Sequence, residues 1–298
     1  LEYTMIHNYT ILSGKEVSSH VYKKLHDRVE YLLKNNIQPG LAAVLVGENP
    51  ASKIYINMKT KTFHKLGLKT ETFKLPAECS QNDLIQVIEK INNDSTFHGI
   101  LVQLPLPNHI DSKSIINSIC PKKDVDGFHP ENAGLLSIGS PRFIPCTPKG
   151  VMRIFEYYKI SLSGKHVVVL GRSNIVGRPM SILTSLKTKG ANSTTTLCHS
   201  GSANIEKFTK IADIIIVALG IPNYLKKDMI RKDAILIDVG INRINDNSEK
   251  GYKLCGDVFW DEVTTKAKAI TPVPGGVGPM TIAMLVENTV EAAENTLK

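Results

Sequence analysis

Two residues one helical turn apart could hold and protonate a flat substrate. Tyr55 and Lys59 are four positions apart, so on a helix they lie one above the other. An aromatic ring can stack on a planar molecule while a nearby amine carries a proton. The plain alternative is a tyrosine at the edge of the core and a solvated lysine, and the pair taken alone favours that alternative.

Polar residues also follow apolar segments where an α/β sheet opens its ligand crevice. Gln103 comes directly after the apolar run 99–102, at the expected end of a strand. Asp124 and Asp126 stand in an irregular stretch further on, and an ionised carboxylate can accept two adjacent N–H donors, as a pterin ring presents them. Simple turn chemistry is the alternative for one of the two aspartates.

A turn that begins at Gly171 and ends at Gly177 follows the apolar run 167–170 and opens a helix. Such a turn directs free backbone N–H groups and the positive end of the helix at a pyrophosphate. The match to G-x-G-x-x-G is incomplete, because Ser173 replaces the second glycine and the last glycine comes one residue late. A plain strand-to-helix turn therefore stays open as an alternative.

The sequence after the next expected strand indicates which dinucleotide is bound. NAD enzymes usually carry an acidic residue there to bind the ribose 2′-hydroxyl. This strand ends in Cys198, His199 and Ser200, and Arg172 lies in the phosphate turn. A 2′-phosphate is accommodated by such a site, so the pattern indicates NADP. The alternative is that Arg172 is an ordinary solvated arginine.

The segment 271–281 contains three glycines among three prolines. This composition predicts a rigid loop whose backbone a ligand can approach closely. The Tyr55–Lys59 spacing also occurs in short-chain dehydrogenases, but there the glycine-rich turn precedes the pair. Here the order is reversed, which excludes that family.

Alternating apolar runs and helical patterns indicate an α/β fold with a largely parallel sheet. Strands are expected at 41–46, 72–75, 100–104, 167–170, 194–198, 214–219 and 235–239. Helices are expected at 52–66, after a capping box at Ser80 and Asp83, from Thr147, at 179–189, and from Pro279 to the C-terminus. In the helix 52–66 the expected core stripe is Ile54, Met58 and Leu66, and the aperiodic stretch 120–145 is interpreted as a long functional loop.

Bulk composition bounds the class of protein. The 298 residues are enough for two domains, and 42% hydrophobic with 21% charged residues excludes a disordered chain. No apolar run approaches the roughly 18 residues of a membrane helix, and no secretion signal is expected. Five scattered cysteines without C-x-x-C argue against disulfides and a metal site, and fit a cytoplasmic location. The net charge of +8 is spread along the chain, which favours anionic small molecules over nucleic acid.

Taken together, these segments closely resemble the bifunctional methylenetetrahydrofolate dehydrogenase/cyclohydrolase family. The resemblance runs from about Ser13 to the end of the chain. It rests on residues 50–59, 99–107, 123–128, 171–179, 238–242 and 271–281, which occur in the family's order.

The resemblance implies two α/β domains with a cleft between them, the second of the Rossmann type. We expect a folate-binding catalytic domain at 1–147 plus 280–298 and an NADP-binding domain at 148–279. It also implies a cytoplasmic homodimer of one-carbon metabolism that acts on a folate, with or without a polyglutamate tail, and that binds neither nucleic acid nor membrane. The activity implied is oxidation of 5,10-methylenetetrahydrofolate with NADP, followed by hydrolysis to 10-formyltetrahydrofolate.

The resemblance assigns a role to each matched residue. Lys59 is the catalytic lysine, Gln103 tunes it, Tyr55 stacks on the aminobenzoyl group and Asp126 holds the pterin. Further folate contacts are implied for Ser52, Leu104, Pro274, Gly275 and Gly276. The cofactor site comprises Gly171, Arg172, Ser173, Ile175, Gly177, His199, Ser200, Ala218, Gly220 and Ile241. No metal is implied.

Two other functions stay open at this stage. One is a dehydrogenase that lacks cyclohydrolase activity, against which the presence of both Lys59 and Gln103 argues. The other is a basic nucleic-acid-binding protein with a decayed Rossmann domain, which salt-dependent retention on DNA without NADP binding would support.

Overall fold

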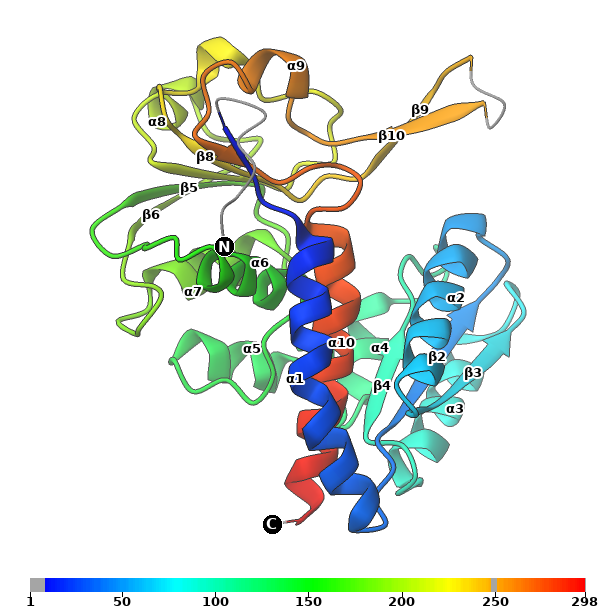
Figure 1. Cartoon of the computed structure of the whole chain (residues 1–298). Helices are drawn as coiled ribbons and strands as arrows, with labels where there is room; N and C mark the ends of the chain where they lie inside the picture. The colour runs from blue at the N-terminus through cyan, green and yellow to red at the C-terminus, as the bar shows by residue number, and fades with distance from the viewer. Residues whose placement is uncertain (1–8, 248–250, 298) are drawn as a thin grey trace. The chain divides into compact units, whose positions relative to one another are not determined.

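The computed structural model describes residues 9–247 and 251–297, and the chain divides into two compact units (Figure 1). The first, here the six-stranded unit, contains the chain up to Ser19 and Thr147–Thr281. The second, here the three-stranded unit, contains His20–Cys146 and the chain from Ile282 onward. Both sheets are parallel, which confirms the predicted fold class.

The three-stranded unit is built on the strand order β3-β2-β4. Its strands are β2 (Gly40–Val46), β3 (Lys69–Leu75) and β4 (Gly99–Val102). Its helices include α2 (Pro50–Lys65), α3 (Gln81–Asn93), α4 (Ser112–Ser118) and α5 (Pro130–Ser137). Every residue of β2 and β4 is buried, as expected for parallel strands covered on both faces.

Helix α3 begins as the sequence predicts. The Ser80 hydroxyl accepts from the Asp83 N–H at 3.1 Å, and the Asp83 carboxylate accepts from the Ser80 N–H at 2.9 Å, which completes the capping box. Apolar residues of α3 and α4 pack against alternate residues of β2 and β4 in one buried cluster, which includes Val44, Ile100, Leu84, Ile88 and Ile115.

The predicted core stripe of α2 was wrong. Ile54 is 53% exposed and Met58 is 49% exposed. The buried face instead contains Ser52, Ile56, Lys59 and Phe63, which recur at helical spacing. Two of these four are polar, so the apolar pattern alone indicated a face that points to solvent. Lys59 therefore lies on the buried face of α2, whereas it was expected beside the core stripe.

Several helices were not predicted. Helix α1 (Gly14–Lys34) precedes the first predicted strand, and α4 lies after β4, where no element was expected. Helix α10 (Val277–Glu294) follows the loop 271–276 as expected. Helix α5 lies inside the stretch that was predicted to be loop, so this prediction was wrong for residues 130–137. It begins with His129 as its N-cap and Pro130 in the first turn, both of which favour a helix start.

The six-stranded unit has the order β1-β11-β8-β7-β5-β6. Its strands are β1 (Thr10–Ile11), β5 (His166–Leu170), β6 (Thr194–Cys198), β7 (Ile214–Val217), β8 (Ile235–Asp238) and β11 (Ala269–Ile270). Its helical segments are α6 (Cys146–Tyr157), α7 (Gly177–Ser185), α8 (Glu206–Thr209), η1 (Lys227–Met229) and α9 (Trp260–Val263), and η2 (Asn295–Leu297) ends the described chain of the other unit. Helix α7 ends four residues before its predicted end.

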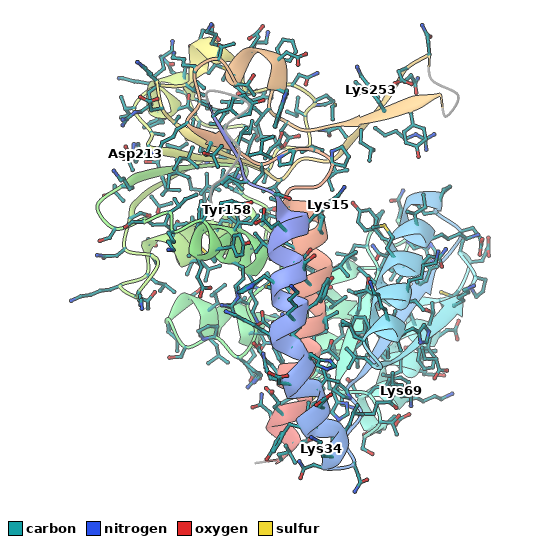
Figure 2. All side chains as sticks on the ribbon, in the orientation of Figure 1. Lys15, Lys34, Lys69, Tyr158, Asp213 and Lys253 are labelled. Carbon is teal, nitrogen blue, oxygen red and sulfur yellow. The ribbon has the colours of Figure 1, made fainter. Side chains whose placement is uncertain are left out.

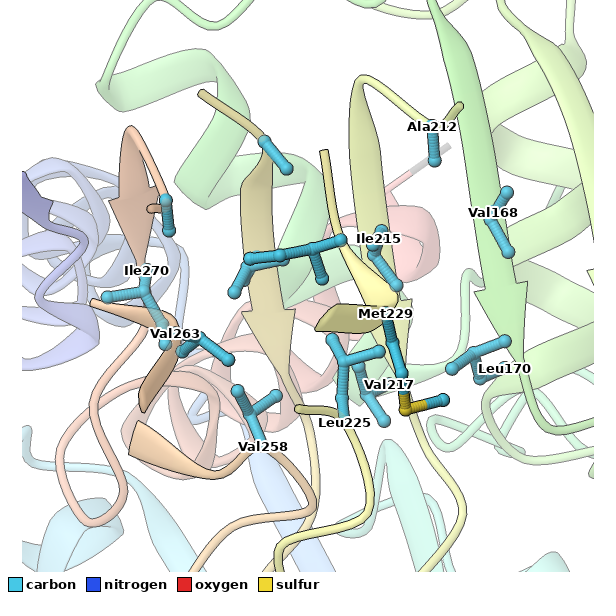
Figure 3. Packing of buried hydrophobic residues seen from close by; sticks show 14 of the residues in the cluster. Val168, Leu170, Ala212, Ile215, Val217, Leu225, Met229, Val258, Val263 and Ile270 are labelled. Carbon is cyan, nitrogen blue, oxygen red and sulfur yellow. The ribbon is translucent and has the colours of Figure 1, made fainter. Parts of the chain in front are cut away.

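One face of this sheet carries a continuous apolar core (Figure 3). Val168 and Leu170 of β5 lie beside Ile215 and Val217 of β7, and the loops after β7 and β10 cover them with residues such as Leu225 and Val258. The cluster leaves the carboxyl ends of β5, β6 and β7 together at one edge, which is where a doubly wound sheet binds its ligand.

The N-terminal segment belongs to the six-stranded sheet. β1 pairs with β11 in parallel register, Thr10 opposite Ala269. The predicted boundary, which placed residues 1–147 in the first domain, therefore differs from the observed units at the N-terminus. Strands β9 (Asn242–Asn245) and β10 (Tyr252–Cys255) form a separate antiparallel hairpin (Figure 1), with the Arg243 guanidinium 3.7 Å from the centre of the Tyr252 ring.

Basic residues are distributed over many elements of both units. Figure 2 shows Lys15 and Lys34 at the two ends of α1, Lys69 at the start of β3 and Lys253 on β10. No helix of the described residues is long and apolar enough to cross a membrane.

Candidate active site

The three-stranded unit brings Lys59 and Gln103 together. The Lys59 Nζ donates to the Gln103 Oε1 at 3.1 Å, and the Gln103 Nε2 donates to the Leu104 carbonyl at 2.8 Å. The second bond fixes the amide, so that its carbonyl oxygen faces the lysine. Helix α2 supplies Lys59 from its buried face, which the sequence did not predict. The end of β4 supplies Gln103, as the sequence predicted.

Burial changes the acid–base behaviour of Lys59. Its side chain is 9% exposed, and this desolvation lowers the pKa of the ammonium, which the nearby Asp126 carboxylate partly offsets. A lysine with a lowered pKa can spend part of a cycle neutral and so accept a proton. Gln103 can stabilise the charged form, because its carbonyl accepts from the ammonium. The arrangement can therefore carry a proton in both directions.

Asp126 lies in the field of Lys59. Burial raises the pKa of Asp126 to about 6, Lys59 lowers it, Asp124 raises it, and a hydrogen bond from Cys146 lowers it. The Cys146 thiol also donates to the Val125 carbonyl at 3.5 Å. A carboxylate that is ionised near neutral pH and that has few protein donors keeps acceptor capacity for a ligand.

Turn chemistry was left open as the role of one of the two aspartates, Asp124 and Asp126. In the structure, Asp124 has this structural role. Its carboxylate accepts from the backbone N–H groups of Phe128 and His129 and from the Asn132 amide, at 2.8–3.2 Å. These bonds close the turn that follows Asp126 and connect it to α5. Asp124 is 1% exposed, so it holds the loop and has no free face for substrate.

Asn288 of α10 was missed by the sequence reasoning. It is fully buried, and its Nδ2 donates to the Val125 carbonyl at 2.7 Å and to the Ile144 carbonyl at 3.0 Å. These two carbonyls flank Asp126 and Cys146. The signal in the sequence is a polar residue between Leu285 and Val290, on the apolar side of the last helix.

We expect Asn288→Ala to lower the free energy of unfolding by roughly 1–3 kcal/mol, because two buried carbonyls lose their donor. It should also weaken substrate binding, since the Val125 carbonyl next to Asp126 and the Ile144 carbonyl near Cys146 are released. Chemical denaturation of the purified variant measures the first effect. Asn93→Ala is the matched control, because Asn93 lies on the exposed face of α3 and its amide donates only within that helix. Equal losses in the two variants would contradict the assignment.

The other predicted folate residues of this unit lie near the same elements. Tyr55, half-buried, is one turn before Lys59, and burial raises the pKa of its hydroxyl. Ser52 is buried in the first turn of α2, where its N–H donates to the Asn49 side chain. Leu104 follows Gln103 and is half-buried, and the Leu104–Pro105 peptide bond is cis.

The predicted cofactor turn lies in the six-stranded unit at the carboxyl end of β5. Gly171 has φ +109°, and a Cβ there would lie 2.2 Å from the Ala218 carbonyl oxygen. A Cβ on Gly177 would lie 1.9 Å from the Gly171 carbonyl oxygen. Both glycines are therefore required by close backbone packing.

The turn presents free donors, although not from the helix start that was expected. The Ser173 hydroxyl accepts from the N–H groups of Val176 and Gly177, so it occupies the first donors of α7. Within residues 9–247 and 251–297, the N–H groups of Ser173, Asn174 and Ile175 have no acceptor. The exposed turn itself is therefore the part that can receive an oxyanion.

Arg172 and His199 stand beside one another at this edge. The Arg172 Nη1 lies 3.5 Å from the His199 Nε2, and the His199 Nδ1 accepts from the Gly201 N–H at 3.1 Å. Ser200 is exposed. The predicted 2′-phosphate residues therefore gather around one exposed guanidinium.

Two buried aspartates, of which sequence reasoning had assigned neither a role, hold the rest of this edge. The Asp257 carboxylate accepts from the Leu219 and Gly220 N–H groups at 2.7 and 2.9 Å. The Asp238 carboxylate accepts from the backbone N–H groups of Gly240, Asp257 and Val258. Burial raises the pKa of Asp238 to about 7, and these three donors act against that rise. The network fixes the backbone at Gly220 and Gly240. Ile241, which follows Gly240 in the chain, is 44% exposed.

The loop 271–276, which precedes α10, packs against the start of α1. The Lys15 N–H donates to the Gly275 carbonyl at 3.2 Å, and a Cβ on Gly14 would lie 1.7 Å from the Gly276 carbonyl oxygen. Gly276 itself lies against the Pro272 carbonyl. Close backbone packing explains Gly276, and Gly275 has φ +105°, a conformation that favours glycine. Pro274 follows a cis peptide bond.

Comparison with known proteins identifies both units. Residues 12–126 match the model of the tetrahydrofolate dehydrogenase/cyclohydrolase catalytic domain, and residues 145–297 match its NAD(P)-binding domain. The chain is 50% identical to the bifunctional protein FolD of Chlorobium phaeobacteroides over 287 residues, which cover 95% of this chain and 96% of the relative. The bifunctional protein FolD of Enterococcus faecalis is 49% identical over 285 residues, with 96% and 98% covered.

Solved structures give the same result. The FolD methylenetetrahydrofolate dehydrogenase/cyclohydrolase of Campylobacter jejuni superposes with a TM-score of 0.91 at 46% identity, covering 97% of this chain and 99% of that one. The methylenetetrahydrofolate dehydrogenase-cyclohydrolase of Trypanosoma brucei, solved with NADP and an inhibitor, gives 0.92 at 34% identity with the same coverage.

Proposed function

The chain belongs to the tetrahydrofolate dehydrogenase/cyclohydrolase family, and on that premise we propose that it oxidises 5,10-methylenetetrahydrofolate with NADP and hydrolyses the methenyl product to 10-formyltetrahydrofolate. The observation that carries the hydrolase half is the buried Lys59 ammonium on the Gln103 carbonyl. A lysine with a lowered pKa beside an acceptor is suited to proton transfer and has no evident structural purpose on a buried helix face.

Oxidation requires mainly that the substrate is held in place. NADP, when bound, supplies the acceptor for the hydride that leaves the methylene bridge. In this proposal Tyr55 stacks on the aminobenzoyl ring, Asp126 accepts from pterin N–H groups, and Ser52 and Leu104 complete the contact. For Pro274, Gly275 and Gly276, the family resemblance implies further contacts with the folate.

Hydrolysis requires protons to move. Water adds its oxygen to the methenyl carbon and loses a proton to Lys59. A ring C–N bond then breaks, the hydroxyl proton leaves to solvent as the carbon becomes the formyl group on the other nitrogen, and the released nitrogen takes a proton from Lys59. Gln103 stabilises the ammonium between these steps, so no net proton remains on the enzyme.

The cofactor turn fits NADP by its donors and charge. The free N–H groups at 173–175 suit the pyrophosphate. Arg172, with His199 and Ser200 at the end of β6, suits a 2′-phosphate, and the three residues that end this strand include no carboxylate.

We expect catalytic efficiency with NADP to exceed that with NAD. Arg172→Ala should raise the KM for NADP by about tenfold or more and leave that for NAD nearly unchanged, because a charge-assisted bond worth about 1.5–3 kcal/mol is lost only with the phosphate. Steady-state kinetics with both cofactors measure this. Arg178→Ala, an exposed arginine on α7, is the control. Equal efficiency with NAD in the unaltered enzyme would overturn the cofactor choice.

Absorbance assays on one preparation test both activities. Methenyltetrahydrofolate should form from the methylene compound with NADP, and added methenyltetrahydrofolate should disappear faster than its uncatalysed hydrolysis. Formation without accelerated hydrolysis would indicate a dehydrogenase alone. The presence of both Lys59 and Gln103 in one hydrogen bond favours the bifunctional enzyme.

Three further properties follow from the family resemblance and are proposed with it. We infer a homodimer, a cytoplasmic location and a folate substrate that can carry a polyglutamate tail. Sedimentation at several concentrations tests the first, since a dimer has twice the chain mass of 32.8 kDa.

A further inference from the structure

A cavity lies in the three-stranded unit, at the amino end of β4. It has a volume of about 720 Å³ and is formed by the end of α3, the turn before β4, the segment 120–123, residues 142–143 and the end of α10. Gln103 follows the opposite, carboxyl end of the same strand. None of the residues proposed to bind folate or NADP lines this cavity.

Cations dominate its lining. Lys122, Lys123 and Arg142 line the cavity, and the described residues that form it include no carboxylate. Arg142 is paired with Glu131, and Lys123 donates to the carbonyls of Ile91 and Asp94. The Asp94 carboxylate is also close to Lys123, and it accepts from the backbone N–H and the hydroxyl of Thr96.

Lys122 is exposed and makes no hydrogen bond or ion pair within the described part of the chain. Its charge is therefore not neutralised by the protein. Lys123 keeps one ammonium proton beyond the two that it donates. Both lysines can thus donate to an added oxyanion.

His98 supplies a second and independent observation. It is 9% exposed and lines the cavity, and its Nδ1 accepts from the Gly40 N–H at 3.1 Å. A neutral imidazole that accepts at Nδ1 carries its proton at Nε2. Burial and the charges of Lys123 and Lys69 lower the pKa of His98, which keeps the ring neutral. The Nε2–H has no acceptor among the described residues and is not shut off from solvent, so it is free to donate to a ligand.

We propose that this cavity binds a small organic oxyanion, whose phosphate or carboxylate group is held by Lys122 and Lys123 and accepts from His98 Nε2. The volume lies in the range of sites for organic ligands and exceeds that of a bare ion. Phe97 and Phe143, each 2% exposed, add apolar wall for the rest of the molecule.

The test titrates inorganic phosphate, and separately citrate, into the full chain in an amine buffer, and follows the ring resonance of His98 by NMR. His98→Asn assigns that resonance. We expect saturable movement with at least one anion, and which anion acts distinguishes phosphate from carboxylate ligands. Lys122→Gln should weaken binding at least fivefold. Lys113→Gln, an exposed lysine on α4 outside the cavity, should not change it.

His98→Asn is the sharper variant, because the asparagine oxygen can still accept from Gly40 while the Nε2 donor is lost. Calorimetry is done in an Arg172→Ala background, which weakens oxyanion binding at the cofactor turn. In that background, His98→Asn should bind the anion at least tenfold more weakly than the protein that keeps His98. An unmoved His98 resonance with both anions, or equal affinities in the Lys122→Gln and Lys113→Gln variants, overturns the proposal. These two lysines are exposed, so the comparison holds even if His98→Asn does not fold.

Discussion

Lys59→Met is expected to lower the rate of methenyltetrahydrofolate hydrolysis by about 10²–10⁴-fold, the usual effect of losing a general acid–base. Water addition and ring opening both need a proton carrier, and Lys59 is the buried amine in hydrogen-bond contact with Gln103. Hydride transfer needs position and a cofactor. Dehydrogenase activity should therefore fall by less, through poorer substrate placement.

Methionine suits the site sterically, because it keeps much of the length and apolar bulk of the lysine stem. The Gln103 carbonyl loses its donor, but its amide still donates to Leu104, so the end of β4 should keep its geometry. Removing a desolvated ammonium also relieves part of its burial cost. We therefore expect the variant to fold and to bind folate.

Lys61→Met is the matched control, because Lys61 lies on the exposed face of the same helix. Both rates are measured on one folded preparation of each variant. Near-normal hydrolysis by Lys59→Met, above the uncatalysed background, would falsify the catalytic assignment and leave Lys59 as a bystander on α2.

The central strands were predictable because they are buried on both faces. The runs at β2, β5, β7 and β8 are nearly all apolar, and such runs require no knowledge of the partner strand. Helix α2 was predicted at the right place with the wrong face, because Ser52 and Lys59 occupy buried positions. A polar residue placed inward for chemistry breaks the pattern from which the face is inferred.

Helix α1 carried a signal that was overlooked. Its buried apolar residues Val17, Val21, Leu25, Val29 and Leu32 recur at helical spacing, but none of them belongs to a long apolar run. Helix α5 is different, because eight residues with two caps form a stable helix only with tertiary support. The bonds of Asp124 to Phe128, His129 and Asn132 provide that support, and they cannot be seen in a local pattern.

The candidate site was proposed from residue type and position along the chain. Gln103 was proposed because it follows a strand, and Asp126 because it stands in an irregular segment. The choice between Asp124 and Asp126 depends on which carboxylate the backbone donors saturate, and only the fold shows that. Asn288 lies 163 positions from Val125, so no periodicity connects it to the loop that it holds.

Asp126→Ala is expected to weaken folate binding by about 10- to 150-fold, which corresponds to about 1.5–3 kcal/mol for a lost bond to a charged acceptor. NADP binding should not change, because the proposed cofactor residues lie in the six-stranded unit. Titration of the variant with each ligand separates the two effects. Both activities should show the loss, since both use the same folate site.

The wild-type enzyme should show the same dependence through pH. Burial raises the pKa of Asp126 to about 6 from an ordinary value of 3.8. The carboxylate is ionised above that pKa, so folate affinity should fall as pH drops through about 6. The effect on folding has the opposite sign. Neutral Asp126 favours the folded state at low pH, and this contribution is lost as pH rises from 3.8 through about 6.

Asp126→Asn removes the titration while it keeps the size of the side chain, so its folate affinity should be weak and nearly independent of pH between 5 and 7, a range about one unit either side of the pKa. Asp124→Asn is the control with the opposite outcome. It should destabilise the loop, because three donors lose a charged acceptor, and leave the folate pH profile in place. If Asp126→Ala binds folate normally and Asp124→Asn does not, Asp124 is the ligand and the roles are reversed.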